Sequence, residues 1–127
     1  MVRRTDTPSQ LATVLVLVVD DDPDTVDTMR EILEEEGHRV LSARNGLEGL
    51  EAALAHRPDL VLLDLEMPVM DGRGFLEAVG KAPSLSDMTV VVLSGTDDAH
   101  IKCESVKKPL RLDTLLGLLG RVASVAS

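Results

Sequence analysis

The chain has 127 residues, of which 44% are hydrophobic and 28% charged, and its formal net charge is −9. This length suits one domain with a core of its own, and the composition is typical of a folded globular chain. The acidic balance disfavours direct nucleic-acid binding, which needs a basic surface. The single cysteine, Cys103, excludes an internal disulfide and suits a reducing cytoplasm.

The start of the chain is polar, and we predict a flexible extension over residues 1–11, with the folded domain over residues 12–127. The longest apolar run is far shorter than the roughly 20 residues that cross a bilayer, and no signal-peptide pattern precedes it. We therefore expect a cytoplasmic protein that does not enter a membrane.

A strand and a helix open the predicted domain. Val14 to Val19 is a continuous run of Val and Leu, which is typical of a strand covered on both faces in a parallel sheet. Asp22 and Pro23 mark the start of a helix, with Asp22 as its cap, and Gly37 ends it. Residues 39–42 form the second predicted strand.

The middle of the chain repeats this alternation. Asn45-Gly46 opens a second helix that ends at Arg57-Pro58, and its apolar stripe consists of Leu47, Leu50 and Leu54. Residues 60–64 form the third strand, and a loop through residues 67–72 leads into a third helix that carries Phe75. Strands that alternate with helices predict an α/β fold with a doubly wound parallel sheet.

The last third of the chain has few residues for the strands and helices that it must form. A fourth strand covers residues 89–94, and a final helix begins near Leu110 with Leu112, Leu115, Leu116 and Leu119 inward. Residues 95–107 must supply a fifth strand of about 5 residues, which leaves roughly 8 for a loop and a helix, fewer than the mean helix of about 11. We predict that the fourth helix is shortened or missing.

Carboxylates follow two of the predicted strands. Asp20-Asp21 come directly after the first strand, and Asp64 ends the third. In an open parallel sheet, ligands bind at the carboxyl ends of the strands. Because crowded carboxylates repel one another, the pattern favours a cation site at this edge over a set of ordinary surface acids.

Four motifs in order resemble the receiver domain of two-component response regulators. These are Asp20-Asp21, the segment from Asp64 to Gly72, Ser94-Gly95 and Lys108-Pro109. The resemblance covers residues 14–122. It implies a five-stranded, flavodoxin-like sheet with strand order 2-1-3-4-5.

The resemblance also implies a metal site. Asp21 would bind Mg²⁺, with Mn²⁺ as an alternative, and Asp20 and Asp64 would act beside it. The backbone carbonyl of Glu66 would supply a further oxygen. Mg²⁺ typically takes one or two carboxylates together with phosphate oxygens, so these residue types suit it.

By the same resemblance, Asp64 would accept a phosphoryl group from a histidine kinase, a histidine phosphotransfer protein or a small phosphodonor. Ser94 and Lys108 would contact the phosphoryl oxygens. A carboxylate is a competent nucleophile, and phosphoryl transfer mostly needs alignment and charge neutralisation. We expect a phosphoacceptor that catalyses only its own phosphorylation and dephosphorylation, and that relays the signal to an output partner which the sequence does not name.

Two departures from the receiver pattern leave an alternative open. Ser105 stands where receivers often carry Tyr or Phe, and the segment before it is short. A pseudo-receiver that binds partners without phosphorylation is therefore the second reading. A phosphatase of the haloacid-dehalogenase type is disfavoured, because those enzymes carry a second Asp where Glu66 stands. The oligomeric state is left open.

Overall fold

The structure, a computed structural model, describes residues 13–64, 72–94, 104–107 and 111–126. Five parallel strands form one sheet in the order β2-β1-β3-β4-β5. The strands are β1 (Leu15–Val19), β2 (Arg39–Ala43), β3 (Leu60–Asp64), β4 (Thr89–Ser94) and β5 (Glu104–Lys107). The predicted fold class and strand order are confirmed. Because the chain leaves β1 for β2 and returns to β3 on the other side, the winding reverses between β1 and β3.

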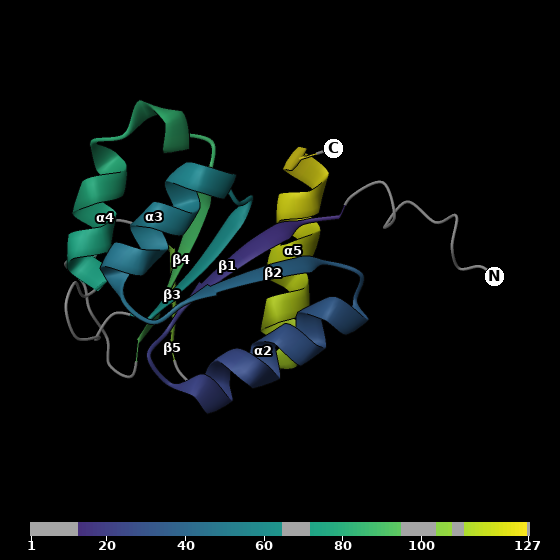
Figure 1. Ribbon diagram of the computed structural model, residues 1–127. Coiled ribbons are helices and arrows are strands. Elements are labelled where there is room, and N and C mark those ends of the chain that lie inside the picture. The colour runs from purple at the N-terminus through teal and green to yellow at the C-terminus, as the bar shows by residue number, and fades with distance from the viewer. Residues whose placement is uncertain (1–12, 65–71, 95–103, 108–110, 127) are drawn as a thin grey trace.

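Helices cover both faces of the sheet. Figure 1 shows α2 (Pro23–Glu35) and α5 (Leu112–Ala126) on one face, and α3 (Gly46–His56) and α4 (Gly72–Gly80) on the other. A short 3₁₀ turn, η1 (Pro83–Leu85), which the sequence did not reveal, links α4 to β4. None of the helices in the described ranges is both long and apolar enough to cross a membrane.

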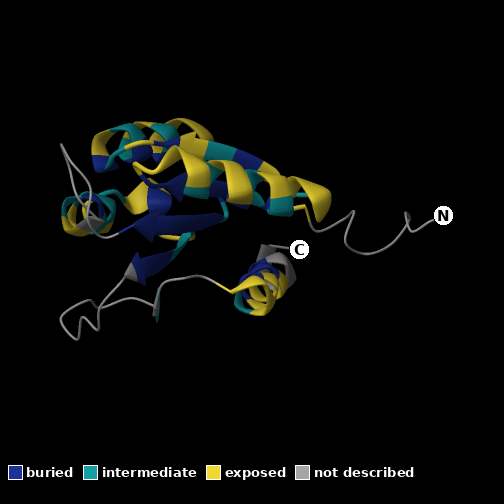
Figure 2. Ribbon diagram, turned by 90° about the horizontal axis from the view of Figure 1, so that it is seen from below, coloured by how far each residue is buried: buried dark blue, intermediate teal, exposed yellow. Residues whose placement is uncertain are grey.

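The strands divide the core into two layers. In β1, Val16 and Val18 pack toward α2 and α5, whereas Leu17 and Val19 pack toward the layer of α3 and α4. Both sets are fully buried, as the continuous apolar run predicted. Figure 2 shows these buried strands between helices whose outer surfaces are exposed.

The helix starts agree with the capping residues. Asp22 caps α2, with Pro23 in its first turn, and Asn45 caps α3 by accepting a hydrogen bond from the Glu48 N–H at 2.9 Å. Both starts lie at the carboxyl ends of strands. Local sequence alone therefore places two helix N-termini beside the edge that carries the acids.

The predicted leucine stripes are partly wrong. On α3, Leu47 and Leu54 are 45% and 48% exposed, and Gly49 and Ala53 face the sheet instead. The face is rotated by one residue because α3 lies too close to β1 for large side chains. On α5, Leu112 and Leu116 are exposed, and the inward leucines are Leu115, Leu118 and Leu119.

Two further predictions lie outside the described residues. The flexible extension over residues 1–11 and the shortened or missing fourth helix within residues 95–103 both fall there. The predicted fifth strand is present as Glu104–Lys107, and it pairs with β4.

Gly49 brings α3 close to the sheet. A Cβ at this position would lie 2.9 Å from Val19 Cγ2 and 3.3 Å from Phe75 Cε1, whereas a Cβ at Gly120 of α5 would meet nothing within 4 Å. We expect Gly49→Ala to lower the free energy of unfolding by about 1–3 kcal/mol through overpacking. Gly120→Ala should raise it by up to about 1 kcal/mol, since alanine is the better helix former. Urea denaturation of both variants checks this, and equal shifts would contradict the packing of α3.

Candidate functional site

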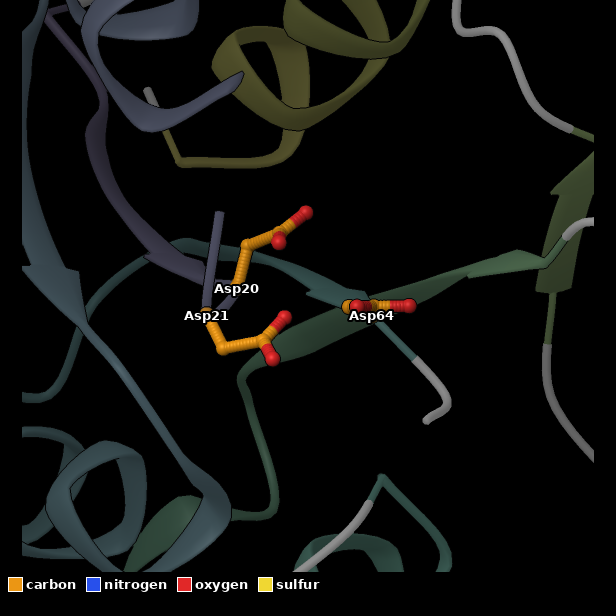
Figure 3. Close-up of side chains that lie close together, drawn as sticks. All are labelled: Asp20, Asp21 and Asp64. Carbon is orange, nitrogen blue, oxygen red and sulfur yellow. The ribbon is translucent and has the colours of Figure 1, made fainter. Parts of the chain in front are cut away.

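The register of β1 and β3 brings their acidic ends together. Val19 lies opposite Leu63, so Asp20 and Asp64 come next to each other at the same edge. One carboxylate oxygen from each of Asp20, Asp21 and Asp64 lies within 4.8 Å of the other two. Figure 3 shows the three side chains gathered between the two strand ends. Three of the predicted site residues thus form one cluster.

Asp20 is fixed in place by the backbone around it. Its N–H donates to the carbonyl of Ala43 at the end of β2, at 3.0 Å, and its Oδ1 accepts a hydrogen bond from the Asp22 N–H at 2.9 Å. Asp20 is 3% exposed and Asp64 is 7% exposed, whereas Asp21 is open to solvent. The cluster therefore has two buried aspartates and one that is exposed.

The N-terminus of α2 lies directly after the cluster. Asp22 Oδ1 accepts from the Asp24 N–H at 3.2 Å, and Asp22 Oδ2 accepts from the Thr25 hydroxyl at 2.7 Å. Asp22 is thereby used as a helix cap, as predicted, and does not belong to the cluster. The positive end of the helix dipole favours negative charge at this edge.

The donor set of the cluster consists of carboxylate oxygens. Buried carboxylates need a charged partner or hydrogen bonds, and oxygen ligands of this kind are preferred by hard divalent cations rather than by metals that prefer sulfur. The residues present therefore fit a divalent cation. Because Asp21 is exposed, the site is open to solvent on its side.

A surface hollow of about 410 Å³ adjoins the cluster between α2 and the end of β2. Its lining consists of Asp20, Asp21, Pro23, Val26, Asp27, Ser42, Ala43 and Arg44. Arg44 lies 3.6 Å from Glu48 of α3, measured between Nη2 and Oε2, so its charge is paired with that carboxylate. This hollow could not be predicted from the sequence, because it depends on how β2 lies beside α2.

Only some of the other predicted site residues lie within the described part of the chain. Ser94 is the last residue of β4 and pairs with Lys107 of β5, so its backbone lies at the acidic edge. Lys108 and Glu66 lie outside the described residues. Ser105 is in β5, opposite Val92. The predicted roles of these residues remain predictions.

A five-stranded parallel sheet with carboxylates at its switch point defines an α/β protein of the flavodoxin-like kind. Comparison with known families narrows this class, because residues 16–114 match the model of the response regulator receiver domain. The chain belongs to this family, and it is a receiver domain of two-component signalling.

Known relatives agree with this assignment. The chain is 34% identical over 113 residues to the transcriptional regulatory protein KdpE of Mycobacterium tuberculosis, covering 83% of this chain and 49% of KdpE. It thus spans about half the length of that relative. It is 30% identical to protein PilH of Pseudomonas aeruginosa, covering 84% of this chain and 95% of PilH.

A solved structure supports the fold. The receiver domain of a signal transduction histidine kinase from Syntrophus aciditrophicus superimposes with a TM-score of 0.82 and 28% identity. The match covers 91% of this chain and 93% of that chain. The likeness therefore extends over nearly the whole domain.

Proposed function

We propose that this receiver accepts a phosphoryl group on Asp64 in a Mg²⁺-dependent reaction and passes the signal to a partner. One observation carries the proposal: Asp64 ends β3, is 7% exposed, and has a carboxylate oxygen within 4.8 Å of carboxylate oxygens of Asp20 and Asp21. A buried carboxylate beside two others is suited to act where a cation neutralises the charge of an incoming phosphoryl group.

The chemistry follows from the residue types. A carboxylate oxygen of Asp64 attacks the phosphorus atom, an acyl phosphate bond forms, and the bond to the donor's leaving group breaks. Asp20, Asp21, Asp64 and the backbone carbonyl of Glu66 would hold Mg²⁺, which supplies neutralisation of the phosphoryl oxygens when bound.

Asp20 and Asp21 differ in what they contribute. The hydrogen bonds that fix Asp20 give it one orientation, so it holds its carboxylate in place before any ligand arrives. Asp21, on the solvent side, can meet an entering hydrated ion. Ser94 and Lys108 would contact the phosphoryl oxygens from the β4 and β5 side, with Lys108 acting as a compact positive charge.

The phosphoryl donor would be a histidine kinase or a histidine phosphotransfer protein, as membership of this family suggests. A cytoplasmic location suits such a donor and the single cysteine. No residue of the domain identifies the output partner. Autodephosphorylation would use the same cluster: a water molecule attacks the phosphorus atom, the bond to the Asp64 oxygen breaks and inorganic phosphate leaves, so the phosphoryl charge again has to be neutralised.

Removal of the metal tests this proposal. With Mg²⁺ and phosphoramidate, a small phosphodonor, intact-mass spectrometry should show the gain of one phosphoryl group, and chelation of the metal should prevent it. Asp21→Asn should raise the Mg²⁺ concentration needed for half-maximal labelling by about tenfold or more, a typical loss when a metal site loses one group. The matched control is Asp87→Asn, an exposed aspartate after η1. Labelling that is unaffected by chelation would contradict the proposal.

A further inference from the structure

The first residues of β1 are held by side chains from two different turns. The Val14 N–H donates to His38 Nδ1 at 3.0 Å, and the Leu15 N–H donates to Asp59 Oδ2 at 2.9 Å. The same turns also donate back, from Arg39 N–H to the Val14 carbonyl at 3.1 Å and from Asp59 N–H to the Leu15 carbonyl at 2.8 Å. The start of β1 is therefore held by hydrogen bonds on both sides.

His38 is positioned by the end of α2. Gly37 has a φ of +89°, and the Gly37 N–H donates to the Glu34 carbonyl while the His38 N–H donates to the Leu33 carbonyl, each at 3.0 Å. This pair of bonds is the Schellman arrangement that commonly ends helices at a glycine. It fixes the His38 backbone, and the imidazole Nδ1 lies against β1.

The hydrogen bond requires a particular form of the imidazole. Since Nδ1 accepts the Val14 N–H, it carries no proton, and the ring is neutral with its proton on Nε2. Burial lowers the pKa of His38, and the negative charge of Glu36 opposes this to a smaller extent. A second proton would turn Nδ1 into a donor that faces another donor.

We propose that His38 is a proton-operated latch on the start of β1. When the imidazole binds a second proton, the Val14 hydrogen bond breaks and this end of the strand opens. Val14 is fully buried in the core layer that contains Leu33 of α2 and Val122 of α5. Opening therefore loosens the contact of β1 with the ends of both helices, at the sheet edge opposite to the acidic cluster.

Burial sets the direction of the effect, and the charged groups around His38 modify it. At the end of α2, the negative charge of Glu36 raises the pKa of His38. Glu35 is exposed, and Glu34 Oε2 lies 3.9 Å from Arg30 Nη1. The exposed Arg39 follows His38 on β2. From α5, the last turns within residues 111–126 carry one charged residue, Arg121. Leu15 of β1 and Val14, which directly precedes the strand, carry no charge.

The sign of the pH dependence follows from the lowered pKa of His38. The unfolded chain binds a proton near the ordinary pKa of 6.5, whereas the folded chain binds it only at lower pH. The stabilisation is therefore complete above pH 6.5 and is lost as the pH falls through the folded-state pKa.

Amide hydrogen exchange, corrected for the intrinsic pH dependence of exchange, tests the latch between pH 7.5 and 5. The protection of the Val14 amide should fall by about tenfold or more as His38 titrates, which corresponds to the loss of roughly one hydrogen bond. The Leu15 amide, held by Asp59, should lose less. The Asp20 amide, which donates to Ala43 at the other edge, should not change.

Two variants make the experiment specific. His38→Gln should remove the pH dependence of Val14 protection, because glutamine does not titrate. The matched control, His56→Gln, replaces an exposed histidine at the end of α3 and should leave the pH dependence intact. Val14 protection that stays constant while the His38 ring titrates, or a measured His38 pKa above 6.5, would overturn the latch. Neither result depends on whether Asp64 is phosphorylated.

Discussion

Asp64→Asn is expected to abolish phosphorylation of the receiver. The amide has nearly the shape of the carboxylate, so the packing at the end of β3 should persist, but its oxygen does not form an acyl phosphate. Incubation with Mg²⁺ and phosphoramidate, followed by intact-mass spectrometry, should show full labelling of the unaltered chain and none of the variant. We expect phosphoryl labelling to be lost completely, because the reaction does not proceed without the nucleophilic carboxylate of Asp64.

The control for this experiment is again Asp87→Asn, which removes one negative charge far from the cluster in the chain and should label normally. Thermal unfolding provides a second readout. Because Asp64 lies within 4.8 Å of two other carboxylates, Asp64→Asn should unfold at the same temperature or higher in the absence of metal. Labelling of the Asp64→Asn variant would mean that another carboxylate, such as Asp20, is the acceptor.

Phe75→Ala is expected to cause the largest loss of stability. Phe75 is the sole aromatic residue of the chain and is fully buried in the layer beneath α3 and α4. Truncation of a buried Phe to Ala typically costs about 3–5 kcal/mol, through lost burial and the cavity left behind. Since small domains are stable by only about 5–15 kcal/mol, the variant should be close to unfolding. Urea denaturation monitored by circular dichroism measures the change.

Two neighbouring substitutions calibrate this prediction. Phe75→Leu keeps most of the apolar volume and should cost less, about 1.5 kcal/mol or under. Leu76→Ala, at a partly buried position on the same helix, should also cost less than Phe75→Ala. Equal losses at Phe75 and Leu76 would mean that Phe75 is not the centre of this layer.

Phe75 also bears on the site through the residues it packs with. Its layer includes Val19 and Leu63, which immediately precede Asp20 and Asp64. A cavity in this layer would let the two strand ends shift, so we infer that Phe75 helps to hold the carboxylates at their spacing. The same packing leaves no room for a side chain at Gly49.

The strands were predictable because their residues leave little choice. The Val and Leu runs of β1, β3 and β4 are buried on both faces, so neither their length nor their direction depends on fine packing. The start of α2 was predictable from Asp22 and Pro23, because a cap is a local hydrogen bond and proline suits the first turn. The inward faces of α3 and α5 were not, since a periodic stripe fits two faces that differ by one residue. The absence of a Cβ at Gly49 decides between them on α3.

The site was partly predictable for the same reason. Parallel strands end at one edge, so Asp20 and Asp64 had to come near each other once both strands were recognised. The hydrogen bond from Asp20 to Ala43 depends on the register of β2 and could not be predicted from the sequence. His38 carried no signal as a lone histidine, because its role depends on the turn at Gly37 and on the start of β1.

A crystal structure with Mg²⁺ and beryllofluoride, a mimic of the phosphoryl group, is the most direct test of the proposed site. We predict that the mimic is bonded to a carboxylate oxygen of Asp64 and that the ion is bound by Asp21 with Asp20 beside it. Ser94 and Lys108 should contact the fluorine atoms. An ion held elsewhere, or a mimic attached to another carboxylate, would contradict the assignment of Asp64 as the phosphoacceptor.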